Sequence, residues 1–278
     1  MPRCGCARSR VAARRRDGYE HCMEPSCRAA LPVRLRLAAV VATMALAACG
    51  DRADASRQPV AVFAAASLSA PFGEIERAFE MANPGFDVRL QLDGSQNLAF
   101  QIQQGARADV FASADEANMR KVTSKGLVEG EPLVFATNGL AIAVQKGNPK
   151  SVRSIADLAR EDLRVAMCGQ SVPIGGYARA ALQKAQVEVR SVSDETSVKA
   201  LVGKVRLREI DAAIVYVTDI TGDDLEAVAI APEHNVRAAY PIATLVAAQQ
   251  RAGASAFVAF VRGEEGRAIL VRHGFAAP

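Results

Sequence analysis

Residues 60–79 read VAVFAAASLSAPFGEIERAF, and this stretch decides the fold class. Residues 60–66 form a short apolar run that ends in small residues, which is typical of a buried strand. The large apolar residues that follow recur at helical spacing, so they would share one face of a helix. They are Leu68, Phe72, Ile75 and Phe79. The stretch therefore predicts a buried strand that leads directly into a helix.

The same strand–helix alternation continues to the end of the chain. Further strands are predicted at residues 88–92, 108–112, 133–144, 163–168, 212–217, 228–231 and 240–246. Helices are predicted at residues 95–104, 115–125, 176–186, 194–205, 255–262 and 264–273. This order predicts an α/β fold with parallel sheets covered by helices on both faces. Ligands of such folds bind beyond the carboxyl ends of the strands.

Composition excludes several classes of protein. The 278 residues are 50% hydrophobic and 23% charged, which argues against disorder. The net charge of +4 comes from arginines in residues 1–48, and the remaining residues carry slightly more acidic than basic side chains. Because aromatic residues make up only 5% of the chain and Trp is absent, no nucleic-acid partner is expected.

The N-terminal part is typical of an export signal. Arg34 and Arg36 precede an apolar run at residues 37–48, which is too short to span a bilayer. Residues 46–50, LAACG, resemble a bacterial lipobox, in which Cys49 would become the lipidated first residue. The alternative is a signal peptide with an incidental cysteine. We expect a precursor segment at 1–48, a lipid-anchored tether at 49–58, and a mature protein on the extracytoplasmic face of the membrane.

Residues 1–32 fit no targeting class. They hold four of the six cysteines, at positions 4, 6, 22 and 27. A zinc module is one interpretation, although the cysteine spacings suit a tetrahedral site poorly. The other is that translation starts later, at Val33, so that residues 1–32 are not made. After processing only Cys49 and Cys168 would remain, so no disulfide framework is expected.

Four segments place small or hydroxylated residues where a helix begins. They are residues 65–68, 94–97, 171–176 and 195–198. A helix start exposes unpaired N–H groups and the positive end of the helix dipole, and with a serine hydroxyl it can bind an anion. Each segment alone is better explained as an ordinary helix cap.

Taken together, the strings VFAAASL (62–68), ADVFASAD (108–115), VPIGGYA (172–178) and IVYVTD (214–219), with the turn at Gly94-Ser95, resemble the molybdate-binding proteins of bacterial ABC importers. The resemblance implies a two-lobed periplasmic-binding-protein fold of class II, with a ligand cleft between the lobes. Lobe 1 would comprise residues 59–137 and 242–278, and lobe 2 residues 138–241. The hinge strands would be 135–138 and 240–243.

The resemblance also implies which residues contact the oxyanion. Ser67, Ser95 and Tyr216 would donate hydroxyl groups, and Ile174 and Val198 would donate backbone N–H groups. Two departures from the family pattern matter. Ile174 is bulkier than usual, and Gln96-Asn97 replaces a hydroxyl-rich run beside Ser95.

The expected function is extracytoplasmic binding of molybdate, and of the similarly sized tungstate, for delivery to an ABC importer permease. Molybdate is fully ionised at neutral pH and needs donors only, whereas monohydrogen phosphate also needs an acceptor. The alternative is a binding protein for sulfate or another tetrahedral oxyanion. Because none of the expected donors titrates near neutral pH, the affinity is expected to be almost flat from pH 6 to 8.

A cleft enzyme on a similar fold is a much weaker hypothesis. Ser67 has no nearby His in the sequence, Asp115 is interpreted as a helix cap, and Cys168 as a buried apolar residue. His234 and His273 are expected to be isolated and exposed. We therefore expect no catalysis, no cofactor, no metal site built from side chains, and a monomer.

Overall fold

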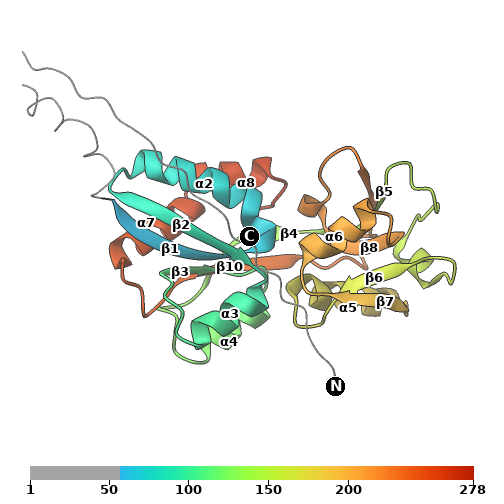
Figure 1. Ribbon diagram of the computed structural model, residues 1–278, viewed down its shortest axis with the longest axis horizontal. Helices are drawn as coiled ribbons and strands as arrows, with labels where there is room; N and C mark the ends of the chain where they lie inside the picture. The colour runs from blue at the N-terminus through green and yellow to red at the C-terminus, as the bar shows by residue number, and fades with distance from the viewer. Residues whose placement is uncertain (1–56) are drawn as a thin grey trace, which may run out of the picture. The chain divides into compact units, whose positions relative to one another are not determined.

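Two five-stranded sheets organise residues 57–278, the part of the chain that the computed structural model describes (Figure 1). The proposed lipobox at Cys49 and residues 1–32 lie outside these residues. The first sheet has the order β2-β1-β3-β10-β4, and the second the order β7-β6-β8-β5-β9. We call the part built on the first sheet lobe 1 and the part built on the second sheet lobe 2.

The strands of lobe 1 run in both directions. β1 is parallel to β2 and β3, whereas β10 is antiparallel to β3 and β4. The strands are β1 (Gln58–Ala65), β2 (Phe86–Asp93), β3 (Val110–Ala112), β4 (Leu133–Asn138) and β10 (Ala238–Thr244).

The sheet of lobe 2 also contains both parallel and antiparallel strands. β6 is parallel to β7 and β8, whereas β5 is antiparallel to β8 and β9. The strands are β5 (Leu140–Gln145), β6 (Val165–Cys168), β7 (Ser191–Glu195), β8 (Ala212–Tyr216) and β9 (Leu225–Ala229). The prediction of parallel sheets therefore holds for β1 with β2 and β3 and for β6 with β7 and β8, but not for β5 and β10. An apolar run does not encode strand direction, and β5 and β10 run against their neighbours.

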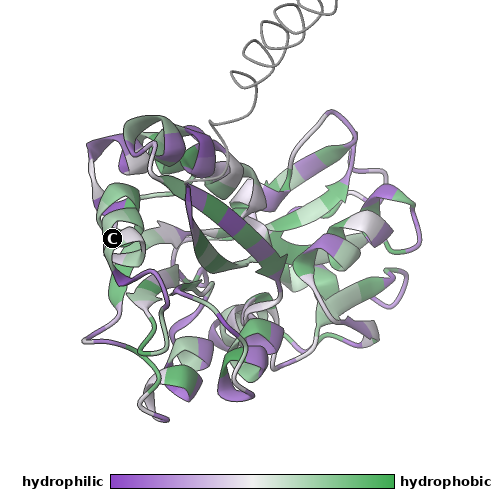
Figure 2. Cartoon of the chain, turned by 60° about the vertical axis from the view of Figure 1, so that its left-hand side comes forward, coloured by the Kyte–Doolittle hydropathy of each residue, from purple (hydrophilic) through white to green (hydrophobic). Residues whose placement is uncertain are grey.

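Helices cover both faces of the first sheet (Figure 1). Those on one face are α2 (Ser69–Ala82), α7 (Arg251–Arg262) and α8 (Glu264–Arg272), and those on the other are α3 (Ser95–Gln103) and α4 (Glu116–Thr123). Alternate residues of β1 serve the two faces: Val62 joins the core under α2, and Phe63 joins the cluster under α3 and α4. Figure 2 shows that hydrophobic and hydrophilic residues occur together along the same helices and strands.

Lobe 2 carries α5 (Pro173–Ala185), α6 (Val198–Arg206) and the 3₁₀ helix η3 (Ile155–Ala159). Two further 3₁₀ helices follow strands: η2 (Ala66–Leu68) after β1, and η4 (Val217–Asp219) after β8. The predicted helix 194–205 is wrong at its start, because β7 continues to Glu195. Ser197 then caps α6 by accepting a hydrogen bond from the backbone N–H of Ala200.

The chain crosses between the lobes at two places. It leaves lobe 1 where β4 ends at Asn138, and β5 begins at Leu140 with only Gly139 between them. It returns between β9 and β10, and β10 pairs with β4. The predicted hinge strands lie in β4 and β10; their movement and the lobe boundaries at 138 and 241 stay predictions.

Candidate functional site

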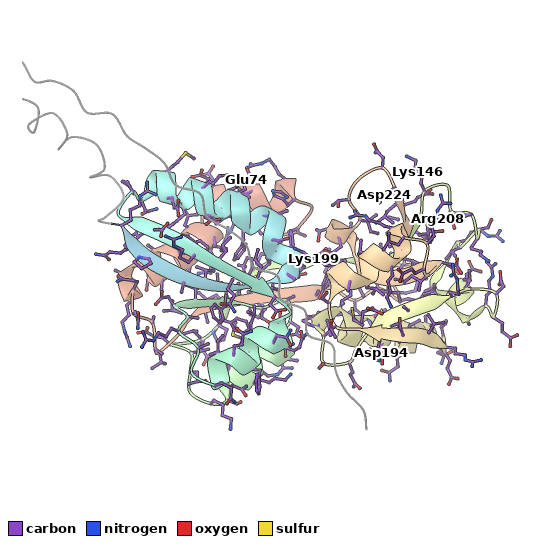
Figure 3. The ribbon with its side chains drawn as sticks, viewed as in Figure 1. Glu74, Lys146, Asp194, Lys199, Arg208 and Asp224 are labelled. Atoms are coloured by element: carbon purple, nitrogen blue, oxygen red, sulfur yellow. The ribbon has the colours of Figure 1, made fainter. Side chains whose placement is uncertain are left out.

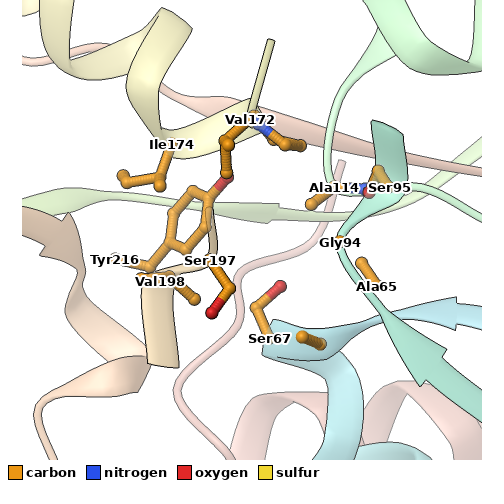
Figure 4. A pocket seen from close by; sticks show the side chains of 12 residues that line it. Ala65, Ser67, Gly94, Ser95, Ala114, Val172, Ile174, Ser197, Val198 and Tyr216 are labelled. Atoms are coloured by element: carbon orange, nitrogen blue, oxygen red, sulfur yellow. The ribbon is translucent and has the colours of Figure 1, made fainter. Parts of the chain in front are cut away.

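A small cavity lies where helix starts from both lobes meet. It measures about 270 Å³ with the space at its mouth. Figure 4 shows the side chains around it. All five residues predicted to bind the oxyanion line it. The lining is Ala65, Ala66, Ser67, Gly94, Ser95, Ala114, Val172, Pro173, Ile174, Ser197, Val198 and Tyr216.

Lobe 1 contributes two strand–helix junctions. β1 runs into η2, which carries Ser67, and β2 runs through Gly94 into α3, which begins at Ser95. No side chain caps either helix, so backbone N–H groups of the first turn remain free to bind a ligand. Ser95 Oγ accepts a hydrogen bond of 3.0 Å from the N–H of Ala114, which leaves the serine proton free to donate.

Lobe 2 contributes the starts of α5 and α6. Pro173 occupies the first position of α5, where its missing N–H does no harm, and Ile174 follows. No side chain caps α5. Ile174 is buried and is one of the residues that line the cavity (Figure 4). Val198 is the first residue of α6, directly after the capping Ser197.

Tyr216 supplies an unpartnered hydroxyl. It is the last residue of β8 and is 1% exposed, and its phenol oxygen is buried with no hydrogen-bond partner in the described residues. Burial raises the pKa of this phenol well above its usual value of 10. The group therefore keeps its proton at neutral pH and can donate it into the cavity.

The cavity lining contains no charged side chain. Its polar groups are backbone N–H groups, three serine hydroxyls and one phenol, all of which can donate hydrogen bonds. A buried polar group needs a partner, and a fully ionised oxyanion accepts hydrogen bonds at every oxygen. The arrangement therefore suits an anion that carries no acidic proton.

One carboxyl group lies close to this neutral site. Asp219 ends η4, three residues after Tyr216, and its Oδ2 is buried without a hydrogen-bond partner. Burial raises the pKa of Asp219 to about 7, and the positive charge of Lys199 opposes this shift. Figure 3 labels Lys199 on α6. Sequence reasoning did not single out Asp219, and a carboxyl group with a pKa of about 7 near the site argues against the expected flat dependence of affinity on pH.

Sequence reasoning also missed Ser197 as a lining residue. Its hydroxyl lies at the cavity while it caps α6. The sequence contained the signal, since Ser197 stands beside Val198 at a helix start. A capping serine and a ligand-binding serine look the same in sequence, because both precede a helix.

Three residues outside the cavity lining, Asp115, Cys168 and His273, were also given roles from the sequence. Asp115 caps α4 through Asn118, as expected. Cys168 is buried, and burial raises the pKa of its thiol to about 12, so it is unreactive. The description of His273 as isolated is wrong, because its Nε2 lies 2.9 Å from Glu74 Oε2. Within residues 57–278, no three His, Cys, Asp or Glu side chains gather as a metal site would require.

Asp109 has a structural role. Its carboxylate accepts hydrogen bonds from the backbone N–H groups of Ala61, Gln249 and Gln250. It therefore ties β1 to the segment before α7, and these bonds use both of its oxygens.

Two side chains reach across the cleft. Gln96 Nε2 donates to the carbonyl oxygen of Thr196 at 3.2 Å, and Asn118 Nδ2 donates to that of Ser171 at 3.4 Å. Both carbonyls stand just before the starts of α6 and α5. The departure from the family pattern at Gln96 thus lies at the rim of the cavity and links the two lobes.

The model of the family described as "Bacterial extracellular solute-binding protein" matches residues 60–276, which is nearly all of the described chain. The chain belongs to this family. As a solute-binding protein it acts outside the cytoplasm, and membership of the family confirms the expectation of a binding protein rather than an enzyme.

This solute-binding protein is 41% identical to the molybdate-binding protein ModA of Mycobacterium tuberculosis over 243 residues, which cover 84% of this chain and 93% of that relative. Its fold is similar to the Azotobacter vinelandii periplasmic molybdate-binding protein, with a TM-score of 0.67 and 19% identity over 79% of this chain and 99% of the other. Its fold is also similar to that of the sulfate-binding protein SubI of M. tuberculosis, with a TM-score of 0.71 and 16% identity. This match covers 80% of this chain and 87% of the other. These likenesses confirm the predicted periplasmic-binding-protein fold.

Proposed function

We propose that this solute-binding protein binds molybdate in the cavity between its lobes and delivers it to an ABC importer. The observation that carries the proposal is the donor-only lining: hydroxyl and N–H groups from both lobes converge, and no charged side chain joins them. The 41% identity to the M. tuberculosis molybdate-binding protein supports the same ligand. Tungstate has nearly the same size and charge, so we expect it to bind as well.

The donors act from fixed elements. Ser67 and Ser95 donate from lobe 1, and Tyr216 donates from lobe 2. The first-turn N–H groups at Ile174 and Val198 add the positive ends of two helix dipoles. Neutral donors that are already in place bind a dianion without the cost of desolvating a charged side chain.

Titration calorimetry of the purified protein with molybdate, tungstate, sulfate and phosphate tests this function. We expect one molar equivalent of molybdate or tungstate to bind, sulfate to bind more weakly because its bonds are shorter, and phosphate to bind weakest of the four, with a measurable Kd far above that for molybdate. Tighter binding of sulfate than of molybdate would favour the alternative ligand. Absence of binding by all four anions would contradict an oxyanion site.

The lipid anchor is a separate part of the proposal. The apolar run before LAACG (46–50) supports acylation of Cys49, although this segment lies outside the described residues. Residues 57–278 hold no helix that is both long and apolar enough to cross a bilayer. Mass spectrometry of membrane-extracted protein should find an acylated N-terminal Cys49, and Cys49→Ala should release the protein or leave it unprocessed. A mature form that is cleaved elsewhere and carries no lipid would contradict the anchor. We further propose that the protein works as a monomer with its permease.

A further inference from the structure

We propose that Tyr240, a residue outside the cavity lining, sets the selectivity of the site by fixing the Ser67 hydroxyl as a hydrogen-bond donor. This inference rests on the proposed function. The phenol oxygen of Tyr240 lies 3.2 Å from Ser67 Oγ, within hydrogen-bond distance. Tyr240 belongs to β10 and is fully buried, whereas Ser67 lines the cavity. The pair therefore connects the ligand site with a strand that links the two lobes.

The direction of this hydrogen bond follows from the ligand. Each hydroxyl has one proton, and a fully ionised oxyanion can only accept. Ser67 must therefore give its proton to the anion, so Tyr240, whose phenol also lies near Asn138 and Tyr216, is the donor in its bond with Ser67 Oγ. A phenol is more acidic than an alkyl hydroxyl, so it is also the better donor of the two.

The other two serines of the cavity show the same arrangement. Ser95 Oγ accepts from the N–H of Ala114 at 3.0 Å, and Ser197 Oγ accepts from the N–H of Ala200 at 3.2 Å. A backbone N–H cannot accept, so the direction of these two bonds is fixed. Tyr240 donates a hydrogen bond to Ser67 Oγ, as backbone N–H groups donate to the hydroxyl oxygens of Ser95 and Ser197. All three serine protons are then available to the cavity.

This arrangement explains how a site of hydroxyl groups can reject a protonated anion. A serine that rotates freely can either donate or accept, and so could pair with the acidic proton of monohydrogen phosphate. A serine whose oxygen is already engaged by an incoming donor presents its proton instead. With all three serines presenting protons, the Tyr216 phenol oxygen is the one side-chain acceptor left in the cavity lining for the proton of the phosphate, which weakens phosphate binding relative to that of an anion that only accepts.

The test measures the binding of molybdate and phosphate to Tyr240→Phe. The phenylalanine ring keeps the packing of Tyr240 against Phe135, Tyr216 and Phe275, whose ring centres lie 6.3, 5.8 and 5.3 Å away. We expect the Kd for molybdate to rise about 5- to 20-fold, and the ratio of the phosphate Kd to the molybdate Kd to fall at least about tenfold. If Tyr240 had only a structural role, the loss of its hydroxyl would weaken the binding of both anions by the same factor. An unchanged ratio would therefore overturn the inference.

A second variant tests the direction of the bond without removing it. Fluorination of the Tyr240 ring to 3-fluorotyrosine makes the phenol a stronger donor and a weaker acceptor. Molybdate should then bind more tightly if Tyr240 donates to Ser67. Weaker binding would show that Ser67 donates to Tyr240 and would overturn the inference.

The matched control is Tyr177→Phe. The Tyr177 hydroxyl accepts from the backbone N–H of Ala239 at 3.2 Å, and its ring belongs to the same aromatic cluster, but it does not line the cavity. This variant should keep the ratio of the phosphate Kd to the molybdate Kd that the unmodified protein has. An equal change of this ratio in Tyr177→Phe and Tyr240→Phe would overturn the role of Tyr240. Tyr240→Phe should also add little to Ser67→Ala. If the unmodified protein binds no molybdate, the proposed function itself has failed.

Discussion

At the level of single residues, three hydroxyl groups are proposed to donate hydrogen bonds to the oxyanion. Ser67→Ala, Ser95→Ala and Tyr216→Phe should each remove one hydrogen bond to a dianion. Such bonds are worth roughly 1.5–3 kcal/mol, so each change should weaken molybdate binding about 10- to 150-fold in titration calorimetry. The serine variants keep their backbone N–H groups and should lie near the lower value.

Ser113→Ala is the control for these variants. Ser113 stands in a similar string of small residues, but its buried Oγ bonds to Asp115 and does not line the cavity. Its replacement should leave the Kd almost unchanged. A loss confined to Ser113→Ala, with normal affinity in the other three variants, would show that the site has been placed wrongly.

Asp219 makes the affinity depend on pH. Its pKa of about 7 means that the carboxyl group is neutral below pH 7 and negative above it. A bound dianion nearby favours the neutral form, so the Kd for molybdate should rise as the pH passes upward through 7. We expect a rise of roughly two- to tenfold between pH 6 and pH 8, which Asp219→Asn should abolish. An equally steep rise in Asp219→Asn would assign the effect to another group.

The same shift predicts an effect on stability. The ordinary pKa of an Asp carboxyl group is 3.8, and folding raises that of Asp219 to about 7. Between about pH 4 and 7 the folded protein therefore binds this proton more tightly than the unfolded chain does. Its contribution to stability is therefore lost as the pH rises through this window. Asp219→Asn should raise the Tm at pH 8 more than at pH 5, as measured by calorimetry. Equal changes of Tm at both pH values would contradict the assignment.

The five residues predicted to contact the oxyanion came from the resemblance of their strings to a known family, and all five line the cavity. Sequence reasoning missed the pairing of Ser67 with Tyr240, since the two residues are 173 positions apart and meet only through the fold. It missed the raised pKa of Asp219 for a similar reason. That shift comes from burial, which no local pattern around Asp219 encodes.

At the element scale, the start of α5 depends on Gly175. An added Cβ at this position would lie 2.1 Å from the carbonyl oxygen of Gly169 and 2.5 Å from that of Cys168. Since both are backbone atoms, Gly175→Ala must push α5 away from the end of β6. We expect a loss of stability of about 1–3 kcal/mol and a molybdate affinity at least about tenfold weaker, because Ile174 moves with the helix.

Gly176→Ala provides the control at the next residue. Its added Cβ would lie 3.8 Å from the carbonyl oxygen of Gln170, an ordinary contact. Alanine is the better helix former, so thermal unfolding should show a stability that is equal or slightly higher, by up to about 1 kcal/mol. Similar losses in both variants would mean that α5 tolerates no side chain on either residue, and that the close approach at Gly175 is not the cause.

Most elements could be predicted from the sequence because apolar periodicity reports burial. β1 and α2 follow the pattern of residues 60–79, and Asp115 caps α4 as expected. Strand direction was not predictable, since the apolar runs of β5 and β10 look the same in either orientation. The start of α6 was placed too early because the polar sequence of β7, SVSDE, lacks an apolar strand pattern.

At the scale of the whole molecule, we expect the lobes to close on the ligand. The cavity takes its lining from both lobes, and Gln96 and Asn118 bond across the cleft to the backbone of Thr196 and Ser171. A ligand that contacts both lobes favours the closed state by its differential affinity for that state. Small-angle scattering of the unlipidated Cys49→Ala protein should therefore give a smaller radius of gyration with saturating molybdate.

Gln96→Ala separates closure from direct contact with the ligand. Gln96 does not line the cavity, so its loss should act by opening the cleft. We expect faster molybdate release and a smaller change in the radius of gyration on binding. A scattering profile that molybdate leaves unchanged in the parent protein would contradict movement at β4 and β10.

We propose that an oxyanion is held between the two lobes by neutral donors. Anomalous diffraction at the molybdenum edge from crystals grown with molybdate tests it most directly, because the peak locates the metal atom without reference to any side-chain assignment. We expect one dominant peak in the cavity between Ser67, Ser95 and Tyr216, with no Lys or Arg side chain in contact with the ion. A dominant peak elsewhere on the molecule, or a molybdate bound by cationic side chains, would contradict it.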